Sequence, residues 1–592
     1  MTFPGVAFVG ASPGAPRSTG QRWSGRCACS PTPDRWHRRR GRCITATPSL
    51  RPLSSRRNHP TRRFLLAYRM NASDTEEVEA LVVGSGVSGA TAAFRLYHAG
   101  VRDVLCTEAR DVVGGNLVSR NADGYLWEEG PNTFQPTSTI LQLAADLDMV
   151  EDVVLADHRL PRYVYWDGTL NALPLSPGDL LGEFRLLSWP GKLRAALGAL
   201  GLVPPLPSGV QVEEWHDGQL QRVPLTPENE SVEEFVTRHL GREVFLKLID
   251  PFVSGVYAGD PRRLAMAAAF KRVFALQQLG GTPGILEGAL IRIGQLRRER
   301  GRQQQEQMAD ARLPSIRPGA LGSFRHGLQQ LPLTVQQVLG EQRLRTRYRL
   351  VSLRYDASRV GRRPFTATYD TPTGTRTVRA EAVALTVPAA VAATILQSAG
   401  LSAARRLADI RSPPVYSVTL AYPRDAFHTP LNGFGNLIPR SMGIRTLGMI
   451  WSSCLFPYRA PESMHMVLAY IGGAQDEAIR DMTPEAVAQQ VHADVQRVLL
   501  KKEAPAPRVL GVRLWPHAIP QYERGHLQTM RELDAALADM PGLYVGGNYR
   551  SGVSFGDCVQ WGTDNAARMR EYLQRCRAAG TGAMKAEATG TA

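Results

Sequence analysis

The chain has 592 residues, 43% of them hydrophobic and 21% charged, an ordinary balance for a globular protein of two or three domains. Its net charge of +16 suggests a nucleic-acid-binding protein, but residues 1–70 hold fourteen Arg, no Lys and one acid, Asp34, and so carry 13 of these charges. Since the remainder is nearly neutral, we expect no nucleic-acid partner. The seven cysteines form no CxxC pair, which argues against a disulfide scaffold and structural zinc, and we expect no metal.

Residues 1–70 are rich in Arg, Ser, Thr and Pro and lack a continuous apolar core. This composition is typical of an organelle transit peptide rather than of a secretory signal. The alternative is a basic tail that binds an anionic partner. The length and the scattered prolines favour a chloroplast over a mitochondrion, and acids from Asp74 onward place the start of the folded protein near Met70–Glu77. No apolar run reaches the ~18 residues of a membrane-spanning helix.

An apolar run at Ala80–Val83 is followed by a glycine-rich turn, a helix-like segment and a second apolar run that ends at Glu108. This order predicts strand, turn, helix, strand and acid, the context in which a GxGxxG turn binds a dinucleotide. Gly86 lets a pyrophosphate approach the backbone, and the helix N-terminus offers it free N–H groups. Glu108 suits the ribose hydroxyls and would repel a 2′-phosphate, which disfavours NADP. The turn consists of Gly84, Ser85, Gly86, Val87, Ser88 and Gly89.

The residues after this acid narrow the choice of dinucleotide. They spell ExRxxxGG, and two adjacent glycines beyond the ribose-binding acid let the chain fold back over a pyrophosphate and a ribityl chain. The pattern is similar to the FAD-binding pattern of the amine oxidase and phytoene desaturase superfamily rather than to that of a plain NAD dehydrogenase. The residues concerned are Glu108, Ala109, Arg110, Gly114, Gly115 and Asn116.

A late apolar strand, residues 543–547, ends in a second glycine pair and is followed by Asn548 and SGVSFGD. Ligands of doubly wound α/β folds bind at the carboxyl ends of the strands. We therefore expect this segment to bring backbone N–H groups and a helix N-terminus to the flavin end of FAD. The FAD-binding domain is then built from both ends of the chain; the alternative is a simple strand, loop and helix.

Other segments are less specific. Residues 178–202 are strongly apolar with sparse cations, which fits either a pair of core helices or a helix in a membrane interface. The Pro-rich stretch 204–228 is expected to be a surface insertion and the Arg- and Gln-rich stretch 296–317 a solvated loop. Residues 383–396 are expected to form a buried strand and turn, and 577–592 a disordered tail.

Seven further motifs carry a resemblance that extends from about Glu76 to Leu573. They are DGYLWEEGPNTFQP (123–136), PGKLRAALGALGL (190–202), PFVSGVYAGDP (251–261), TLGMIWSSCLFPYRAP (446–461), YIGGA (470–474), GVRLWPHAIPQY (511–522) and GGNYRSGVSFGDCV (546–559). Together they resemble the protoporphyrinogen oxidases of the plant plastid type.

The resemblance implies a multidomain α/β fold with a discontinuous Rossmann-like FAD-binding domain, a mixed-sheet substrate domain and a helical membrane-binding domain. The family attaches to membranes peripherally, and a homodimer is a family expectation. The expected parts are a transit peptide (1–70), three FAD-binding segments (76–150, 285–360 and 506–576), a membrane-binding segment (158–264), a substrate-binding segment (361–505) and the tail (577–592).

The reaction that the resemblance implies is the six-electron oxidation of protoporphyrinogen IX. Three O2 are consumed and three H2O2 released, giving protoporphyrin IX for haem and chlorophyll. The expected chemistry is transfer of a hydride from a meso carbon to flavin N5, after which O2 reoxidises the flavin. No residue stands out as a general base, so positioning is expected to be the main contribution of the protein.

The substrate is a large apolar macrocycle with two propionates, which needs an apolar slot and a cation. By resemblance, Arg162 pairs with a propionate, and Trp451 packs on a pyrrole ring where plant forms usually have Tyr or Phe. Phe434 and Leu437 are expected in the wall of the slot. The alternatives are a surface arginine at Arg162 and a core tryptophan at Trp451.

Two positions are expected beside the reacting atoms. The backbone of Gly255 approaches the macrocycle, and Asn132 borders both flavin and substrate. The other cofactor contacts that the resemblance implies are Gly130, Pro131, Val351, Trp515, Gly547, Asn548 and Val553.

Four other functions remain open. A coproporphyrinogen III oxidase of the same fold would need more cations around its slot, for four carboxylates. An amine or polyamine oxidase would need an aromatic cage, which GGNYRSGVSFGD does not provide. A non-catalytic FAD-fold carrier would bind FAD without turnover. An NAD-dependent reductase is disfavoured by ExRxxxGG.

Overall fold

The computed structural model describes residues 75–174, 179, 184–216, 218–280, 284–309, 312–313 and 319–589. The predicted transit peptide, 1–70, lies outside these residues. So do 178 and 180–183 of the apolar stretch 178–202.

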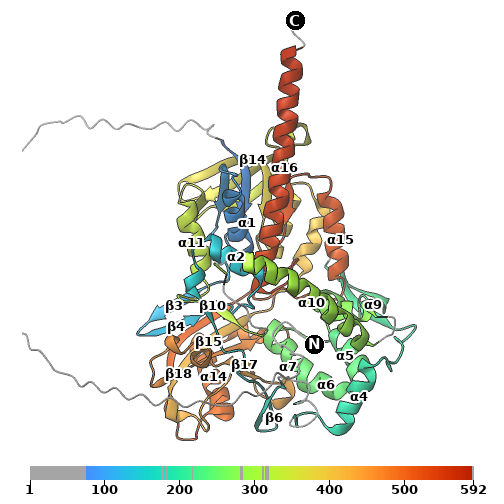
Figure 1. Ribbon diagram of the computed structural model, residues 1–592, viewed down its shortest axis with the longest axis vertical. Coiled ribbons are helices and arrows are strands. Elements are labelled where there is room, and N and C mark those ends of the chain that lie inside the picture. The colour runs from blue at the N-terminus through green and yellow to red at the C-terminus, as the bar shows by residue number, and fades with distance from the viewer. Residues whose placement is uncertain are drawn as a thin grey trace, which may run out of the picture. The chain divides into compact units, whose positions relative to one another are not determined.

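The strand predicted before the glycine-rich turn is the centre of a seven-stranded sheet, here called the FAD sheet (Figure 1). It pairs in parallel with the strand before Glu108 on one side and with a strand from the middle of the chain on the other. The strands are, in order, β11 (Leu344–Arg345), β2 (Val104–Thr107), β1 (Glu76–Val83), β14 (Gly374–Leu385), β13 (Phe365–Thr371) and β12 (Arg349–Tyr355), with β20 (Leu543–Val545) parallel to β14.

Helices cover both faces of the FAD sheet, because its central strands carry apolar side chains on both sides. Ala80 and Val82 pack with one set of helices, and Leu81 and Val83 pack with the other. The first set is α1 (Val87–His98), α2 (Ser138–Asp146), α11 (Gln330–Leu339) and α16 (Phe555–Thr589); the second is α12 (Ala389–Ser398) and α15 (His526–Leu537).

A second seven-stranded sheet, here called the substrate sheet, lies below the FAD sheet in Figure 1. The helix α14 (Pro484–Leu499) packs its apolar side on one face of this sheet. The strands are, in order, β19 (Arg508–Trp515), β15 (Val415–Pro423), β18 (Met464–Gly472), β17 (Thr446–Ile450), β16 (Gly435–Leu437), β6 (Arg162–Trp166) and β7 (Thr169–Ala172).

Strand pairing corrects three predicted domain boundaries. β6 and β7 fall in the predicted membrane-binding segment 158–264 but pair in the substrate sheet, as does β19 from the predicted FAD-binding segment 506–576. Conversely, β13 and β14 fall in the predicted substrate-binding segment 361–505 but belong to the FAD sheet. These boundaries were wrong because β6, β14 and β19 each pair with a strand far away in the sequence, where local pattern gives no signal.

The helical part of the chain has its own apolar core, which includes Phe235, Phe252, Val253 and Phe270. Its helix α5 begins with a capping box, in which Ser231 and Glu234 satisfy each other's backbone N–H groups. The elements are α4 (Trp189–Ala199), α5 (Val232–Leu240), α6 (Arg242–Val244), the π-helical turn η2 (Phe245–Ile249), α7 (Asp250–Phe252), the π-helical turn η3 (Val253–Tyr257), α8 (Met266–Ala269) and α9 (Lys271–Leu279).

Helix α4 decides between the two interpretations of 178–202 for the residues that are described. Trp189 is 69% exposed and Leu193 61% exposed, and Leu197 and Leu200 continue the same exposed stripe at helical spacing. A core helix would bury this stripe, so the core interpretation is wrong for α4.

Several local predictions also need correction. The expected loop 296–317 is helical up to Ala309, as part of α10 (Ile285–Ala309), because Arg, Gln and Glu are good helix formers. The tail expected to be disordered from 577 continues α16 to Thr589, in an alanine-rich sequence that favours helix. The strand and turn expected at 383–396 are the end of β14 and most of α12.

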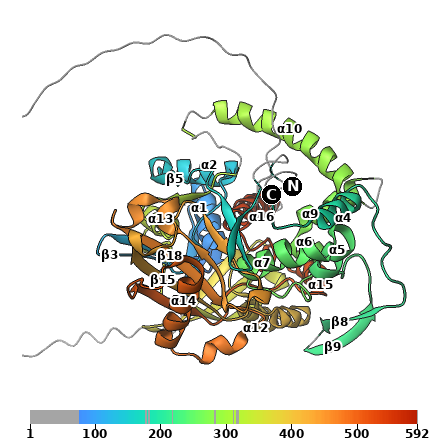
Figure 2. The same cartoon turned by 90° about the horizontal axis from the view of Figure 1, so that it is seen from below.

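The Pro-rich insertion forms a hairpin, β8 (Gln211–His216) and β9 (Gln219–Pro224), which stands away from the two sheets in Figure 2. Shorter elements complete the fold: β3 (Ser119–Ala122), β4 (Tyr125–Glu128), β5 (Val153–Leu155), β10 (Gly322–Phe324) and α13 (Ser452–Leu455). Among the described helices, none has the length and apolar content needed to cross a bilayer. The described residues contain no cluster of His, Cys, Asp or Glu that could hold a metal ion.

Just before the segment 129–132, a buried ion pair joins the hairpin of β3 and β4 to the connection between β17 and β18. Glu128, at the end of β4, lies 3.6 Å from Arg459, and both side chains are fully buried. Glu128 also accepts hydrogen bonds from the Leu328 N–H and the Ser119 hydroxyl, and Arg459 donates to the Ser323 hydroxyl. Burial raises the pKa of Glu128 to about 7, despite the opposing effect of Arg459 and of these donors.

This pKa predicts how stability depends on pH. Between the ordinary carboxyl pKa and about 7, the unfolded chain has lost the Glu128 proton and the folded chain keeps it, so the free energy of unfolding falls as pH rises. We expect Glu128→Gln to remove this fall. From about pH 5 to about pH 8, the free energy of unfolding of the variant should therefore rise by roughly 1–3 kcal/mol relative to that of the wild type. Denaturant unfolding of both proteins across this range measures it. Parallel pH curves for wild type and variant would contradict the assignment.

Candidate functional site

The glycine-rich turn has the shape that the sequence predicts. Gly84 has φ +98°, and a Cβ there would lie 2.9 Å from the carbonyl oxygen of Thr386. A Cβ on Gly89 would lie 1.9 Å from the carbonyl oxygen of Gly84, so the start of α1 packs directly on the turn. A Cβ on Gly86 would meet nothing nearer than the Cα of Gly115 at 3.9 Å. The backbone at Gly86 is therefore open on the side where a pyrophosphate would bind.

Glu108 is oriented by the same turn. Its Oε2 accepts hydrogen bonds from the Ser85 N–H at 3.0 Å and the Ser85 hydroxyl at 2.7 Å, and its Oε1 accepts from the Arg110 N–H at 3.0 Å. The Arg110 guanidinium in turn donates to the carbonyl of Gly115. The ribose-binding acid and the two glycine motifs are thus one hydrogen-bonded unit.

The glycine pair Gly114 and Gly115 closes over the glycine-rich turn. Gly114 and Gly115 have φ of +119° and +60°, and a Cβ on Gly115 would lie 3.0 Å from the Cα of Gly86. This approach confirms the predicted fold-back of the chain. An open backbone at Gly86, a fixed carboxylate and a glycine cover fit the diphosphate and ribose of FAD.

Hydrogen bonds to the segment 129–132 hold together residues that are predicted to lie at the flavin end of the site. The indole N–H of Trp515 donates to the carbonyl of Glu129 at 2.6 Å, and the Tyr470 hydroxyl donates to the carbonyl of Gly130 at 2.8 Å. A Cβ on Gly130 would lie 1.9 Å from the carbonyl oxygen of Asn116 and 3.6 Å from the Trp515 ring. The structure therefore brings Asn116 and Gly130 together with Trp515, which lies far from both in the sequence.

Asn132 follows in the same segment, after the exposed Pro131. Its side chain is 5% exposed, and among the described residues neither its amide oxygen nor its amide nitrogen has a hydrogen-bond partner. A buried polar group without a partner is costly, and a bound ligand would satisfy it. This unsatisfied, buried amide is the observation that best supports a position for Asn132 beside a cofactor and substrate.

The other predicted cofactor contacts are less tightly placed. Gly547 has φ +142°, and the carbonyl of Asn548 accepts a hydrogen bond from the Tyr522 hydroxyl. Val553 packs against the helical core. Val351 lies on β12 and is 53% exposed, so its side chain is available to a ligand but makes no core contact that would fix it.

Arg162 begins β6, and its guanidinium lies 5.7 Å from the centre of the Phe434 ring. Its one hydrogen bond is a long contact, 3.5 Å, to the carbonyl of Gly319. Burial lowers the pKa of Arg162, and no carboxylate of the described residues pairs with it. A largely buried guanidinium without a counter-ion is a site for an anionic ligand.

Gly255 lies in the π-helical turn η3 and packs on the substrate sheet. A Cβ there would lie 2.4 Å from the Leu437 side chain and 3.5 Å from the Leu447 carbonyl oxygen. The structure thus brings Gly255 and Leu437 into contact, as a common wall between η3 and β16. π-Helical turns in other proteins are frequent at functional sites.

Trp451 is buried, as its core alternative expects, and its contact with a pyrrole ring stays a prediction. Its ring is 2% exposed and stacks on Tyr163 at 5.3 Å, within the core that the substrate sheet forms with α14. The backbone N–H of Trp451 donates to the carbonyl of Phe434 at 2.9 Å, and Phe434 packs with Leu455 and Phe456. The core alternative therefore describes the burial of Trp451.

Sequence reasoning missed residues that hold the site without belonging to a motif. Thr386, just after β14, donates to the carbonyls of Val83 and Gly84 and packs against Gly84 and Gly89. Its position at the carboxyl end of an apolar strand is a signal that could have found it. Ser417, which donates to the carbonyl of Glu129, sits inside a strand and gives no such signal.

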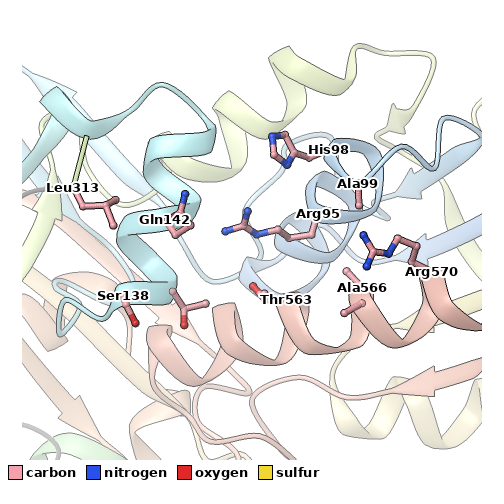
Figure 3. Close-up of a pocket in the computed structure, with 11 residues that line it drawn as sticks. Arg95, His98, Ala99, Ser138, Gln142, Leu313, Thr563, Ala566 and Arg570 are labelled. Atoms are coloured by element: carbon pink, nitrogen blue, oxygen red, sulfur yellow. The ribbon is translucent and has the colours of Figure 1, made fainter. Parts of the chain in front are cut away.

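A cavity of about 500 Å³ lies elsewhere, between α1, α2 and α16 (Figure 3). Arg95, His98 and Arg570 line it with the hydroxyls of Ser138 and Thr563. These α1 residues are roughly 15 Å along the helix from the glycine turn at its start. No predicted site residue lines this cavity, so it is separate from the candidate site.

Two of the three glycines of the turn, Gly86 and Gly89, allow a matched pair of tests. Gly89→Val places a side chain against backbone and should prevent stable folding, because neither Gly84 nor α1 can move independently. Gly86→Val should leave a folded protein with wild-type helix content that no longer retains FAD. Circular dichroism and bound flavin absorbance distinguish the two; FAD retention by Gly86→Val would contradict the placement of the pyrophosphate.

Comparison with known proteins agrees with this geometry. The model of the family of flavin containing amine oxidoreductases matches residues 87–570. In solved structures, a protein from Exiguobacterium sp. 255-15, provisionally assigned as a protoporphyrinogen oxidase, covers 84% of this chain and 99% of its own, with a TM-score of 0.63 and 21% identity. At this identity the likeness shows the fold alone.

Two curated relatives show where the chain lies within the family. Coproporphyrinogen III oxidase of Bacillus subtilis (strain 168) is 27% identical over 83% of this chain and 98% of its own length. Protoporphyrinogen oxidase 1, chloroplastic, of Spinacia oleracea is 42% identical over 509 residues, which are 84% of this chain and 85% of that protein. The chain therefore belongs to the flavin containing amine oxidoreductase family and, within it, to the protoporphyrinogen oxidases of the plant chloroplast type.

Proposed function

We propose that the protein is an oxygen-dependent oxidase of protoporphyrinogen IX in the plastid, with FAD as its cofactor. It converts protoporphyrinogen IX and three O2 to protoporphyrin IX and three H2O2. Bound FAD supplies the two-electron oxidation of the substrate and the return of those electrons to O2. The observation that carries the proposal is the buried, unpaired guanidinium of Arg162 beside an apolar wall, in a chain that also holds an FAD cradle.

The substrate would lie against the wall that η3 and β16 form together. Arg162 would bind a propionate, since a guanidinium stays charged when buried and offers paired donors to a carboxylate. Phe434 and Leu437 would face the macrocycle, and Gly255 would let its backbone come close to it. Asn132 would satisfy its buried amide against flavin and substrate.

The cations near β17 favour a substrate with two carboxylates over one with four. Arg440 is largely buried on this side of the sheet, but it already donates to the carbonyls of Arg445 and Gly472. Of these two guanidinium groups, that of Arg162 is the one with only a single long hydrogen bond to the described residues, and so the one able to bind a carboxylate. This supports protoporphyrinogen over coproporphyrinogen as the substrate, and an amine substrate would be repelled.

Replacement of Arg162 tests the anchor. Arg162→Met should raise the KM for protoporphyrinogen IX about 10- to 100-fold, the loss expected for a charge-assisted hydrogen bond, while FAD content stays unchanged. Arg159→Ala, an exposed arginine paired with Asp157, is the matched control. Porphyrin fluorescence above the rate of autoxidation is the measurement. Equal KM values for Arg162→Met and the control would refute the anchor, and faster turnover of coproporphyrinogen III would favour that alternative.

We infer that the exposed apolar stripe of α4 lies in a membrane interface. Lys192 sits 4.8 Å from the Trp189 ring, the pairing of aromatic and cation that suits the headgroup level. α10 lies beside α4 (Figure 2), and it too exposes apolar side chains, Leu290 and Ile293, along one stripe. Large exposed apolar stripes on neighbouring helices mark an interaction surface rather than a solvated one.

Charge on this stripe should release the protein from membranes. Leu193→Glu combined with Leu200→Glu is expected to abolish flotation with vesicles of plastid lipid, because both side chains face outward from α4. Activity on detergent-dispersed substrate should persist. Val391→Glu, on the exposed side of α12 in the FAD-binding part, is the control. Unchanged flotation of the double variant would place the membrane contact elsewhere.

Two further properties follow the resemblance. The similarity to a chloroplastic relative supports import into the chloroplast. We also propose a homodimer, on the family expectation alone; light scattering of the protein lacking residues 1–70 in detergent would measure its mass directly.

A further inference from the structure

The turn η3, which carries Gly255, is held in an unusual way at its end. Ala258, directly after the turn, has a left-handed backbone with φ +49°, a conformation that an alanine rarely adopts unless its surroundings impose it. Three successive carbonyl groups, those of Tyr257, Ala258 and Gly259, lie at the end of η3. Each of them is bound by a residue from a distant segment.

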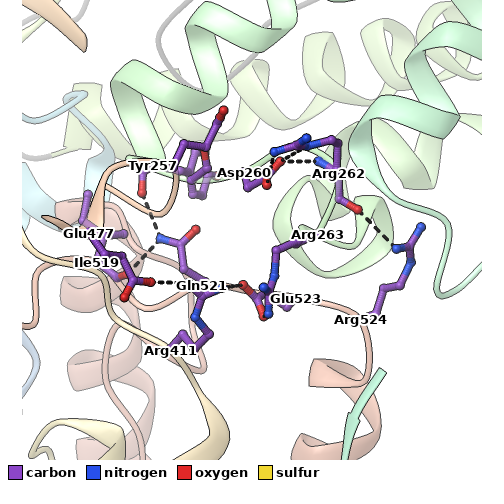
Figure 4. A network of polar contacts seen from close by, with 12 residues as sticks. Tyr257, Asp260, Arg262, Arg263, Arg411, Glu477, Ile519, Gln521, Glu523 and Arg524 are labelled. Atoms are coloured by element: carbon purple, nitrogen blue, oxygen red, sulfur yellow. Dashed lines mark hydrogen bonds and ion pairs between the residues drawn. The ribbon is translucent and has the colours of Figure 1, made fainter. Parts of the chain in front are cut away.

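Gln521 binds the first of these carbonyls (Figure 4). Its side chain is 1% exposed, and its amide nitrogen donates to the carbonyl of Tyr257 at 2.9 Å and to that of Ile519 at 2.9 Å. The backbone N–H of Gln521 donates to the carbonyl of Arg411 at 2.8 Å. Both amide hydrogens are therefore used, and since carbonyl oxygens are the neighbours, only the NH2 group can face them.

The substrate sheet binds the next two carbonyls. Ala474 N–H donates to the carbonyl of Ala258 at 2.8 Å, and the Gln475 side chain donates to that of Gly259 at 3.3 Å. A Cβ on Gly473 would lie 2.6 Å from the Ala258 carbonyl oxygen, so this contact depends on a glycine. The end of η3 is thus held from two sides.

The segment that carries Gln521 also reaches the flavin end of the site. Trp515, six residues earlier, is bound to the carbonyl of Glu129. Two residues after Gln521, Glu523 pairs with Arg411 and with Arg263, which closes the network around the turn in Figure 4. Residues 515–523 therefore form a strap between the segment 129–132 and the end of η3.

We propose that Gln521 is a positioning residue, which sets the distance between the Gly255 turn and the flavin end through its bond to Tyr257. The proposal rests on the proposed function, because it assigns Gln521 to the site of that reaction. Gln521 does not itself touch the reacting atoms. It acts on Gly255, which packs on Leu437 and cannot shift without opening the wall of the slot.

The test compares three variants of the protein lacking residues 1–70. Gln521→Leu removes the two donors and keeps the volume; it should lower kcat about 10- to 100-fold, the cost of a misplaced substrate, with FAD content and KM nearly unchanged. Gln521→Glu should lose activity near neutral pH and recover part of it as pH falls, because a buried, protonated carboxyl can again donate to the Tyr257 carbonyl. Arg262→Gln, an exposed arginine on the same loop, is the control.

Hydrogen exchange gives a second readout that needs no turnover. Backbone amides of residues 253–259 and 473–475 should exchange faster in Gln521→Leu than in the control. If kcat and exchange of Gln521→Leu both match the control, the proposal is wrong. If the wild-type protein does not oxidise protoporphyrinogen, the proposed function fails, and hydrogen exchange alone decides. Faster exchange in Gln521→Leu then supports the positioning role of Gln521, and unchanged exchange overturns it.

Discussion

The close contact between the first glycine turn and the end of β14 is the constraint on which the rest of the structure depends. Gly84, Gly89 and Thr386 meet at backbone distance, and the hydroxyl of Thr386 bonds to the carbonyls of Val83 and Gly84, where β1 enters the turn. This contact joins parts of the chain about 300 residues apart. It fixes the start of α1, and α1 in turn supports α16, which packs along it.

From that contact the site extends in one direction. Gly114 and Gly115 cover the turn, and the chain then passes through β4 to the segment 129–132, which receives bonds from Ser417, Tyr470 and Trp515. All three donors come from the substrate sheet or its end. The cofactor-binding part is therefore bonded to the substrate sheet at the place where the flavin would meet the substrate.

The sequence predicted the glycine-rich turn and the glycine pair that covers it well, because close local contacts require glycine at these positions. Gly84, Gly86, Gly89 and Gly115 have the backbone angles and close approaches that a GxGxxG turn and a glycine pair require. Domain boundaries were predicted poorly, because β6 pairs with β16, β14 with β1 and β19 with β15, and each pair is far apart in the sequence. The long helices α10 and α16 were missed where polar or alanine-rich sequence resembled a loop or a tail.

Within the site, prediction depended on whether a role shows in the residue type. Arg162, which the resemblance singled out, lies largely buried without a counter-ion among the described residues, as a propionate anchor requires. Trp451 is apolar enough for either a substrate slot or a core, and in the structure it is buried in the core. Gln521 and Thr386 act through hydrogen bonds to backbone carbonyls, which leave no pattern in a sequence.

The most direct test of the account is to mix the FAD-loaded protein with protoporphyrinogen IX in the absence of O2. We expect the absorbance of the oxidised flavin to disappear as porphyrin forms, and to return with release of H2O2 when O2 is admitted. An unchanged flavin spectrum after addition of the substrate would contradict the account and would favour a carrier or another substrate.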